Sequence, residues 1–192
     1  MTLINSPAHT VSVPDHFVDD ETGAGFSVFQ DTSAEDPRTW ISDDSKIAMY
    51  VFNGPRHEHD SEIPENIAAQ AFARFYEIYD EIRALELTKR WLAAFHPETQ
   101  YDLAVETIRG HSQSDWAEVF AASIVDQPDG TPGYGTAQSH IAIYAQWRWG
   151  DVWVVDPDGE DSSFDPMGGI YADDPEEALR LFLDEHQLRK AA

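Results

Sequence analysis

The chain has 192 residues and a formal net charge of −24, from 12 Lys and Arg against 36 Asp and Glu. This balance disfavours direct binding to nucleic acid, which requires a basic surface, and favours basic partners. Hydrophobic residues make up 42% of the sequence, enough for a packed core, yet no apolar run approaches the ~20 residues that a membrane-spanning helix needs. The absence of cysteine excludes disulfides, a thiolate nucleophile and cysteine-ligated metal sites.

The N-terminal segment, residues 1–45, is polar and interrupted by Gly and Pro, so we expect loops with one short strand at Phe26–Gln30. It has neither the basic start nor the apolar stretch of a signal peptide, which favours a cytoplasmic protein. The next segment, Lys46–Asn53, predicts a strand that is apolar on both faces and is therefore expected at the centre of a sheet.

A helical region is predicted over residues 62–96, as one long helix or two. Its apolar residues recur at helical spacing, which predicts that Phe72, Phe75 and Tyr79 face the core. Tyr101–Arg109 alternates and predicts a strand. Trp116–Val125 is predicted as its partner strand, with a helix as the alternative because of its alanine content.

The C-terminal part predicts a hairpin of His140–Trp149 with Val152–Asp156. On that hairpin three Trp side chains would share one face, either in the core or as an exposed platform for a partner: Trp147, Trp149 and Trp153. A loop over residues 157–169 and a final helix from Asp173 to Leu188 complete the chain. We therefore expect a single domain over residues 1–192 with an α+β fold, in which the helices pack on a mainly antiparallel sheet.

Four short blocks resemble a family of uncharacterised acidic proteins from phages and actinobacteria. They are Asp36-Pro37-Arg38-Thr39-Trp40 (Pro-Arg-x-Trp), Gly110-His111-Ser112-Gln113-Ser114-Asp115-Trp116 (Gly-Tyr-Ser-Gln-Gly-Asp-Trp), Gly150-Asp151-Val152-Trp153, and Asp161-Ser162 ahead of Gly168-Gly169-Ile170-Tyr171. His111 and Ser114 depart from the Tyr and Gly of the pattern. The resemblance implies a phage or mobile-element setting, in which small acidic proteins often interfere with host enzymes.

The segment Arg56-His57-Glu58-His59-Asp60 is a weak candidate metal site. His57 and His59 would point to one side of an extended segment, and Asp60 could supply an oxygen ligand. This arrangement would suit a metal-dependent enzyme, although an ordinary acidic surface loop explains the same residues. No cofactor is otherwise expected.

Two further motifs carry residue types that are found in functional sites. His111, Ser112 and Asp115 are the residue types of a hydrolase triad, but in one short turn they are better explained as turn-forming side chains. The acids between Asp156 and Asp161 partly match a calcium loop, yet the twelfth position is Met167 where an EF-hand has Glu.

The acids concentrate near the C-terminus. Between Asp151 and Glu185 there are twelve carboxylates and one base, Arg180. We expect this surface to bind a partner through nine residues: Asp151, Asp156, Asp158, Glu160, Asp161, Asp173, Asp174, Glu176 and Glu177. The sequence thus favours a non-enzymatic inhibitor that mimics DNA and occupies a basic, DNA-binding host protein, while halophilic or solubility-driven acidity is the alternative.

Overall fold

The computed structural model describes residues 14–19, 23–38, 46–55, 62–125, 135–158 and 165–191. These residues form seven strands and four helices, with the strands in two antiparallel sheets, which confirms the predicted α+β fold. The chain divides into two compact units, here called unit 1 (Met1–Glu35 with Gln146–Ala192) and unit 2 (Asp36–Ala145). The single-domain prediction stays a prediction, because a unit built from both ends of a chain can still fold together with the segment that it encloses.

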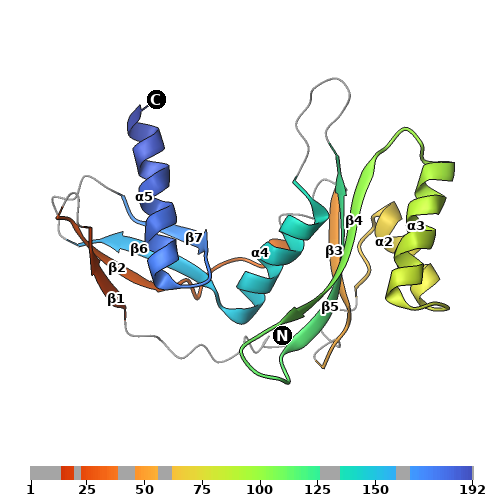
Figure 1. Cartoon of the computed structure of the whole chain (residues 1–192), viewed down its shortest axis with the longest axis horizontal. Coiled ribbons are helices and arrows are strands. Elements are labelled where there is room, and N and C mark those ends of the chain that lie inside the picture. The colour runs from red at the N-terminus through yellow and green to blue at the C-terminus, as the bar shows by residue number, and fades with distance from the viewer. Residues whose placement is uncertain are drawn as a thin grey trace, which may run out of the picture. The chain divides into compact units, whose positions relative to one another are not determined.

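Unit 1 is a four-stranded sheet covered by one helix. The sheet has the order β1-β2-β6-β7, with β1 at Asp15–Val18, β2 at Gly25–Gln30, β6 at Val152–Pro157 and β7 at Met167–Tyr171. The C-terminal helix α5 (Pro175–Ala191) lies across this sheet (Figure 1). Phe182 of α5 meets Phe26 of β2 edge to face, with ring centroids 5.7 Å apart and both side chains fully buried. This aromatic contact lies at the centre of the core of unit 1.

Unit 2 is a three-stranded sheet with two helices on one face (Figure 1). Its strands are β3 (Ile47–Asn53), β5 (Trp116–Ile124) and β4 (Tyr101–Arg109), in that order. The helices are α2 (Ile67–Tyr76) and α3 (Glu81–Phe95). The ring of Phe72 on α2 stacks on that of Phe120 on β5 with centroids 4.4 Å apart, and both rings are completely buried. The core of unit 2 forms around this pair.

The predicted helical region, residues 62–96, is two helices, of which the first begins only at Ile67. They are separated at residues 77–80, whereas the sequence suggested a joint near Glu81–Glu86. Asp80 begins α3 because its carboxylate accepts a hydrogen bond from the backbone N–H of Arg83 at 2.8 Å. Phe72 is buried and Phe75 is half-buried, as predicted. Tyr79 was predicted to face the core, and this is wrong: it lies in the turn between the helices and is 45% exposed. Helical spacing no longer determines where a side chain points once the helix has ended.

The position of β3 also differs from the prediction. Met49 and Val51 are buried on one face of β3, and Ala48 and Tyr50 on the other, as expected from the apolar sequence. However, β3 is an edge strand, and β5 is the central one. Burial of both faces requires only that layers cover the sheet on both sides, so it does not fix a strand's neighbours within the sheet.

The segment predicted as the first strand of a C-terminal hairpin is the helix α4 (Ala137–Trp149). Its buried residues follow helical spacing: Ala137, His140, Ile141 and Tyr144. The helix begins where the carboxylate of Asp102, on β4, accepts a hydrogen bond from the backbone N–H of Ala137 at 2.8 Å. Thr136, directly before the helix, also caps it, because its hydroxyl accepts from the backbone N–H of Ser139 at 3.0 Å. The β-branched and aromatic content of the segment misled the prediction despite this local cap.

Three smaller corrections concern unit 1. The segment predicted to be mostly loop contains β1 in addition to β2, and β7 begins inside the loop predicted over 157–169. Trp147 and Trp149 lie on α4 and Trp153 on β6, so the three Trp residues do not share the face of one hairpin. Trp153 is a core residue whose indole N–H donates to the carbonyl of Ala172 at 2.9 Å.

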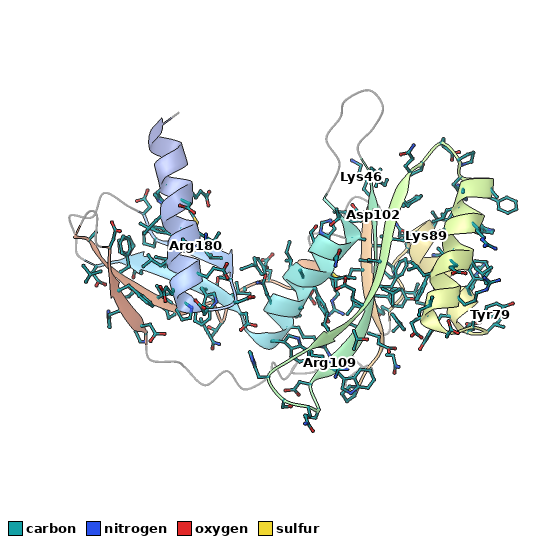
Figure 2. The ribbon with its side chains drawn as sticks, in the orientation of Figure 1. Lys46, Tyr79, Lys89, Asp102, Arg109 and Arg180 are labelled. Atoms are coloured by element: carbon teal, nitrogen blue, oxygen red, sulfur yellow. The ribbon has the colours of Figure 1, made fainter. Side chains whose placement is uncertain are left out.

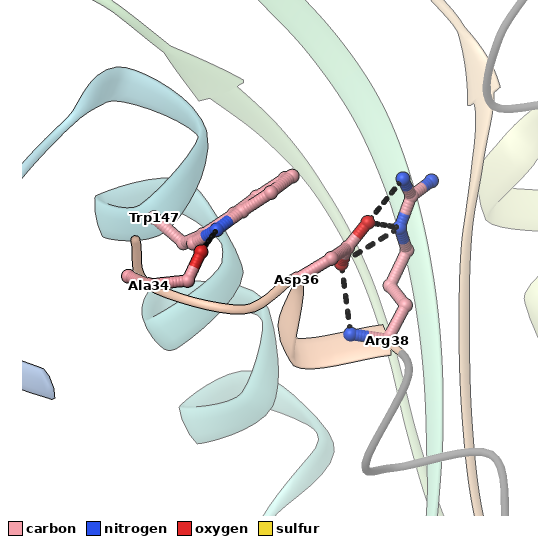
Figure 3. A network of polar contacts seen from close by, with 4 residues as sticks. All are labelled: Ala34, Asp36, Arg38 and Trp147. Atoms are coloured by element: carbon pink, nitrogen blue, oxygen red, sulfur yellow. Dashed lines mark hydrogen bonds and ion pairs between the residues drawn. The ribbon is translucent and has the colours of Figure 1, made fainter. Parts of the chain in front are cut away.

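The first block of the resemblance lies where the chain passes from unit 1 to unit 2. The guanidinium of Arg38 pairs with the carboxylate of Asp36 at 2.6 Å, and Asp36 also accepts from the backbone N–H of Arg38 (Figure 3). These contacts give Asp36 and Arg38 a structural role in forming a tight turn, while Thr39 and Trp40 lie outside the described residues. Before the block, in unit 1, the carbonyl of Ala34 accepts a hydrogen bond from the indole N–H of Trp147 at 3.0 Å.

Candidate functional site

The N-terminal end of α5 is shaped by two of the predicted partner-binding acids. Asp174 precedes Pro175, which suits the first helical position because it has no N–H to satisfy. The carboxylate of Asp174 accepts from the backbone N–H of Glu177 at 2.8 Å, and that of Glu177 accepts from the backbone N–H of Asp173 at 3.1 Å. These carboxylates also lie at the positive end of the helix dipole, where negative charge stabilises a helix.

Three acids of α5 lie on the side of the helix away from the core. Ala178, Leu179 and Phe182 are buried on one side. The opposite side carries what we call the acidic face of α5, consisting of Glu176, Glu177 and Asp184. Of these, Glu177 is half-buried and the other two are exposed. Glu185 is also exposed, but it lies seven positions after Ala178 and therefore on the side of the helix that carries the core residues. Helical geometry therefore directs one half of the helix surface to the sheet and presents the acidic face on the other half.

An open hollow of about 540 Å³ lies beside this face. The residues that line it are Asp19, Asp174, Glu176, Glu177, Arg180, Leu183 and Asp184. Its one basic side chain, Arg180, is labelled in Figure 2 and donates to the carboxylate of Glu177 at 3.0 Å. The lining therefore combines five carboxylates with a single cation that is already paired.

Sequence analysis did not place Asp19 and Asp184 among the partner-binding residues. The sequence could have indicated Asp184. Glu177, Arg180 and Asp184 are three and four positions apart and therefore share one face of the predicted helix. Asp19 had no such signal, because it directly follows β1, a strand that the polar N-terminal sequence did not predict.

The remaining predicted acids are more dispersed in unit 1. Asp158 accepts from the hydroxyl of Ser27 at 2.7 Å and lies 4.0 Å from the imidazole of His16, so it joins the turn after β6 to the hairpin of β1 and β2. Asp156 is exposed on β6, and Asp151 is half-buried before β6. Glu160 and Asp161 lie outside the described residues. The structure thus brings Asp174, Glu176 and Glu177 together in the hollow, and Asp173 beside them by its bond to Glu177.

The candidate metal residues His57, His59 and Asp60 lie outside the described residues. In the part of the chain that the structure describes, no group of three or more His, Asp or Glu side chains is arranged to hold a metal ion. The metal site at these histidines stays a prediction.

The turn that contains His111, Ser112 and Asp115 connects β4 to β5. The hydroxyl of Ser112 lies 2.8 Å from that of Ser114, and the backbone N–H of Asp115 donates to the carbonyl of Ser112 at 3.0 Å. His111, Ser112 and Ser114 are exposed. These contacts are those of a surface turn, as the sequence favoured.

No protein-family model, no curated protein and no solved structure matches the chain. The resemblance to a phage and actinobacterial family therefore stays a prediction. Among the helices of the described residues, none combines the length and apolar character needed to cross a membrane.

Proposed function

We propose that the chain is a non-enzymatic binding protein that mimics DNA and occupies a basic, DNA-binding host protein. The observation that carries this proposal is the acidic hollow of unit 1, whose lining has five carboxylates and one cation, Arg180, already paired with Glu177. Such a surface attracts basic partners and repels phosphates. In the setting that the family resemblance implies, the chain would act as a phage or mobile-element inhibitor in the host cytoplasm.

The density of charge along α5 supports mimicry of DNA over a merely acidic surface. From Asp174 to Glu185 the chain carries five carboxylates, Asp174, Glu176, Glu177, Asp184 and Glu185, and one base, Arg180. At about 1.5 Å per helical residue this stretch is about 17 Å long. One strand of B-DNA has a phosphate every ~3.4 Å along the axis, hence about five over the same length, and the duplex has about ten. The net negative charge per unit length is therefore close to that of one DNA strand.

A capture experiment with a DNA competitor tests the proposal. The full chain is immobilised, incubated with an actinobacterial lysate, and divided into two equal portions, one eluted with polyglutamate and the other with duplex DNA at the same ionic strength. A protein held through its DNA-binding surface should resist polyglutamate and be released by duplex DNA. Proteins released equally by both polyanions would indicate general charge attraction, and captured proteins that DNA does not release would contradict the mimicry.

A further inference from the structure

Unit 2 has an apolar surface that its core does not use. Ile78 and Tyr79, in the turn before α3, are 73% and 45% exposed, and Ile82 in the first turn of α3 is 68% exposed. Figure 2 shows Tyr79 at this turn, on the outside of the helix pair. Phe95, at the other end of α3, is also 67% exposed, but it lies on a different side of the helix, with its ring 5.6 Å from that of Trp91. Scattered apolar residues are normal on a surface, but three large ones within five positions are characteristic of a contact site.

The charge around this surface differs from that of the rest of the chain. Between Arg74 and Phe95 there are four bases, Arg74, Arg83, Lys89 and Arg90, and four acids, Glu77, Asp80, Glu81 and Glu86. The segment is therefore neutral in a chain whose net charge is −24. Two strongly acidic molecules can approach each other only where such local repulsion is absent.

The outward side of α3 is complementary to itself in the antiparallel direction. Four exposed residues, spaced four, three and four positions apart, share this side: Ile82, Glu86, Lys89 and Ala93. When two copies of α3 pair antiparallel about a two-fold axis near Leu87, Ile82 of each copy lies opposite the small side chain of Ala93. Glu86 of each copy then lies opposite Lys89. Each favourable contact occurs twice, as two-fold symmetry requires.

We propose that a second copy of this chain docks on the outward side of α3, forming an antiparallel two-fold dimer. One stripe residue already has a contact within its own helix: Glu86 pairs with Arg83 at 2.7 Å, and the two side chains are about half exposed, at 52% and 46%. An exposed pair of this kind contributes little, so Glu86 can exchange it for Lys89 of the second copy. The proposal is independent of the DNA mimicry, because it uses unit 2 residues that are not part of the acidic face of α5.

The stability of this dimer should depend on salt concentration in the opposite sense from that of a complex with a basic partner. The net charge of the two copies opposes association at low ionic strength, whereas the Debye length falls from about 10 Å at 0.1 M salt to about 3 Å at 1 M. Dimerisation should therefore strengthen with salt, opposite to the binding of a basic partner. Sedimentation equilibrium of the full chain at 0.1 M and 1 M NaCl measures the effect. A chain that stays monomeric at both salt concentrations, up to about millimolar protein, overturns the proposal.

Charge exchange on α3 tests the antiparallel register. Lys89→Glu should weaken the dimer because two acids then face each other, and adding Glu86→Lys should restore it by recreating the pair with exchanged signs. Ile82→Asp should weaken the dimer about tenfold or more. Circular dichroism of each variant checks that these exposed substitutions leave the fold intact. A double variant no better than Lys89→Glu, or a dimer unaffected by Ile82→Asp, would place the second copy elsewhere and overturn the proposal.

Discussion

The carboxylate of Asp174 accepts a hydrogen bond from the backbone N–H of Glu177 at 2.8 Å, so one of the acids proposed to bind a partner also begins α5. Glu176 and Asp184, which line the same hollow, make no such contact among the described residues. The acidic hollow therefore contains acids with a structural role and acids without one. This difference decides which substitutions can test binding without disturbing the helix.

Two substitutions of Asp174 should separate the stability contributed by its hydrogen bond from the stability contributed by its charge. Asp174→Ala removes the acceptor of the Glu177 N–H and should lower the free energy of unfolding by about 1 kcal/mol. Asp174→Asn keeps an acceptor and loses only the interaction of the charge with the helix dipole, about 0.3–1 kcal/mol. Urea denaturation of both variants measures the difference. Equal losses for Ala and Asn would show that the hydrogen bond contributes nothing.

The contact between Asp102 and Ala137 should stabilise unit 2 in the same way. Asp102→Ala leaves the first N–H of α4 without this acceptor, and we expect a loss of about 1 kcal/mol. Asp102→Asn should lose less, since its side-chain oxygen can still accept. Chemical denaturation, followed by tryptophan fluorescence because Trp147 and Trp149 lie on α4, reports the change. If the denaturation midpoint of Asp102→Ala equals that of the wild type, this account of how α4 begins is contradicted.

Alkaline pH should destabilise unit 2 through Tyr50. Burial, and to a lesser extent Tyr76, raises the pKa of Tyr50 far above its ordinary value. The unfolded chain releases this proton near pH 10 while the folded chain retains it, so the free energy of unfolding falls as pH rises above about 10. Below pH 10 the contribution is fully present. Tyr50→Phe should flatten the decline measured by urea denaturation between about pH 9 and 11, although Tyr76 and Tyr101, whose pKa values burial also raises, will leave part of it.

The same variant should be tolerated at neutral pH. The hydroxyl of Tyr50 is buried and has no hydrogen-bond partner among the described residues. Removing it therefore relieves a desolvation cost, and Tyr50→Phe should be as stable as the wild type or more stable by up to about 1 kcal/mol. A loss of more than about 1 kcal/mol at pH 7 would indicate that the hydroxyl has a partner.

The chain itself should not bind duplex DNA. Its acids outnumber its bases three to one, and the acidic face of α5 would repel phosphates. Electrophoresis of a labelled duplex at physiological salt should show no retardation by the purified chain. Retardation would show that a basic surface exists despite the net charge.

Much of the fold followed from local pattern, whereas some features depend on residues distant in sequence. Alternation predicted β4, and helical spacing predicted α3 and α5. β5 was predicted as the partner strand of β4 with a helix as the alternative, and its continuous burial over Val119–Ser123 is that of a central strand covered on both faces. The strand-like content of α4 misled the prediction, although the hydroxyl of Thr136 provides a local cap by accepting from the backbone N–H of Ser139. The second acceptor at this helix start, Asp102, lies 35 positions away from Ala137. The acidic hollow was predictable on α5, where spacing defines a face, but Asp19 reaches it only through tertiary packing.

The central claim is that the acidic face of α5 holds the basic partner, and matched charge removal tests it most directly. Glu176→Gln with Asp184→Asn removes two charges from the hollow, whereas Glu62→Gln with Glu65→Gln removes two exposed charges from unit 2. The measurement is the dissociation constant for the protein that duplex DNA releases from the chain, determined from about 0.1 M to 1 M salt. We predict that the hollow variant binds about tenfold more weakly and with a shallower salt dependence, while the unit 2 variant stays within about twofold of wild type. Equal weakening by both variants, or none by either, would contradict the claim.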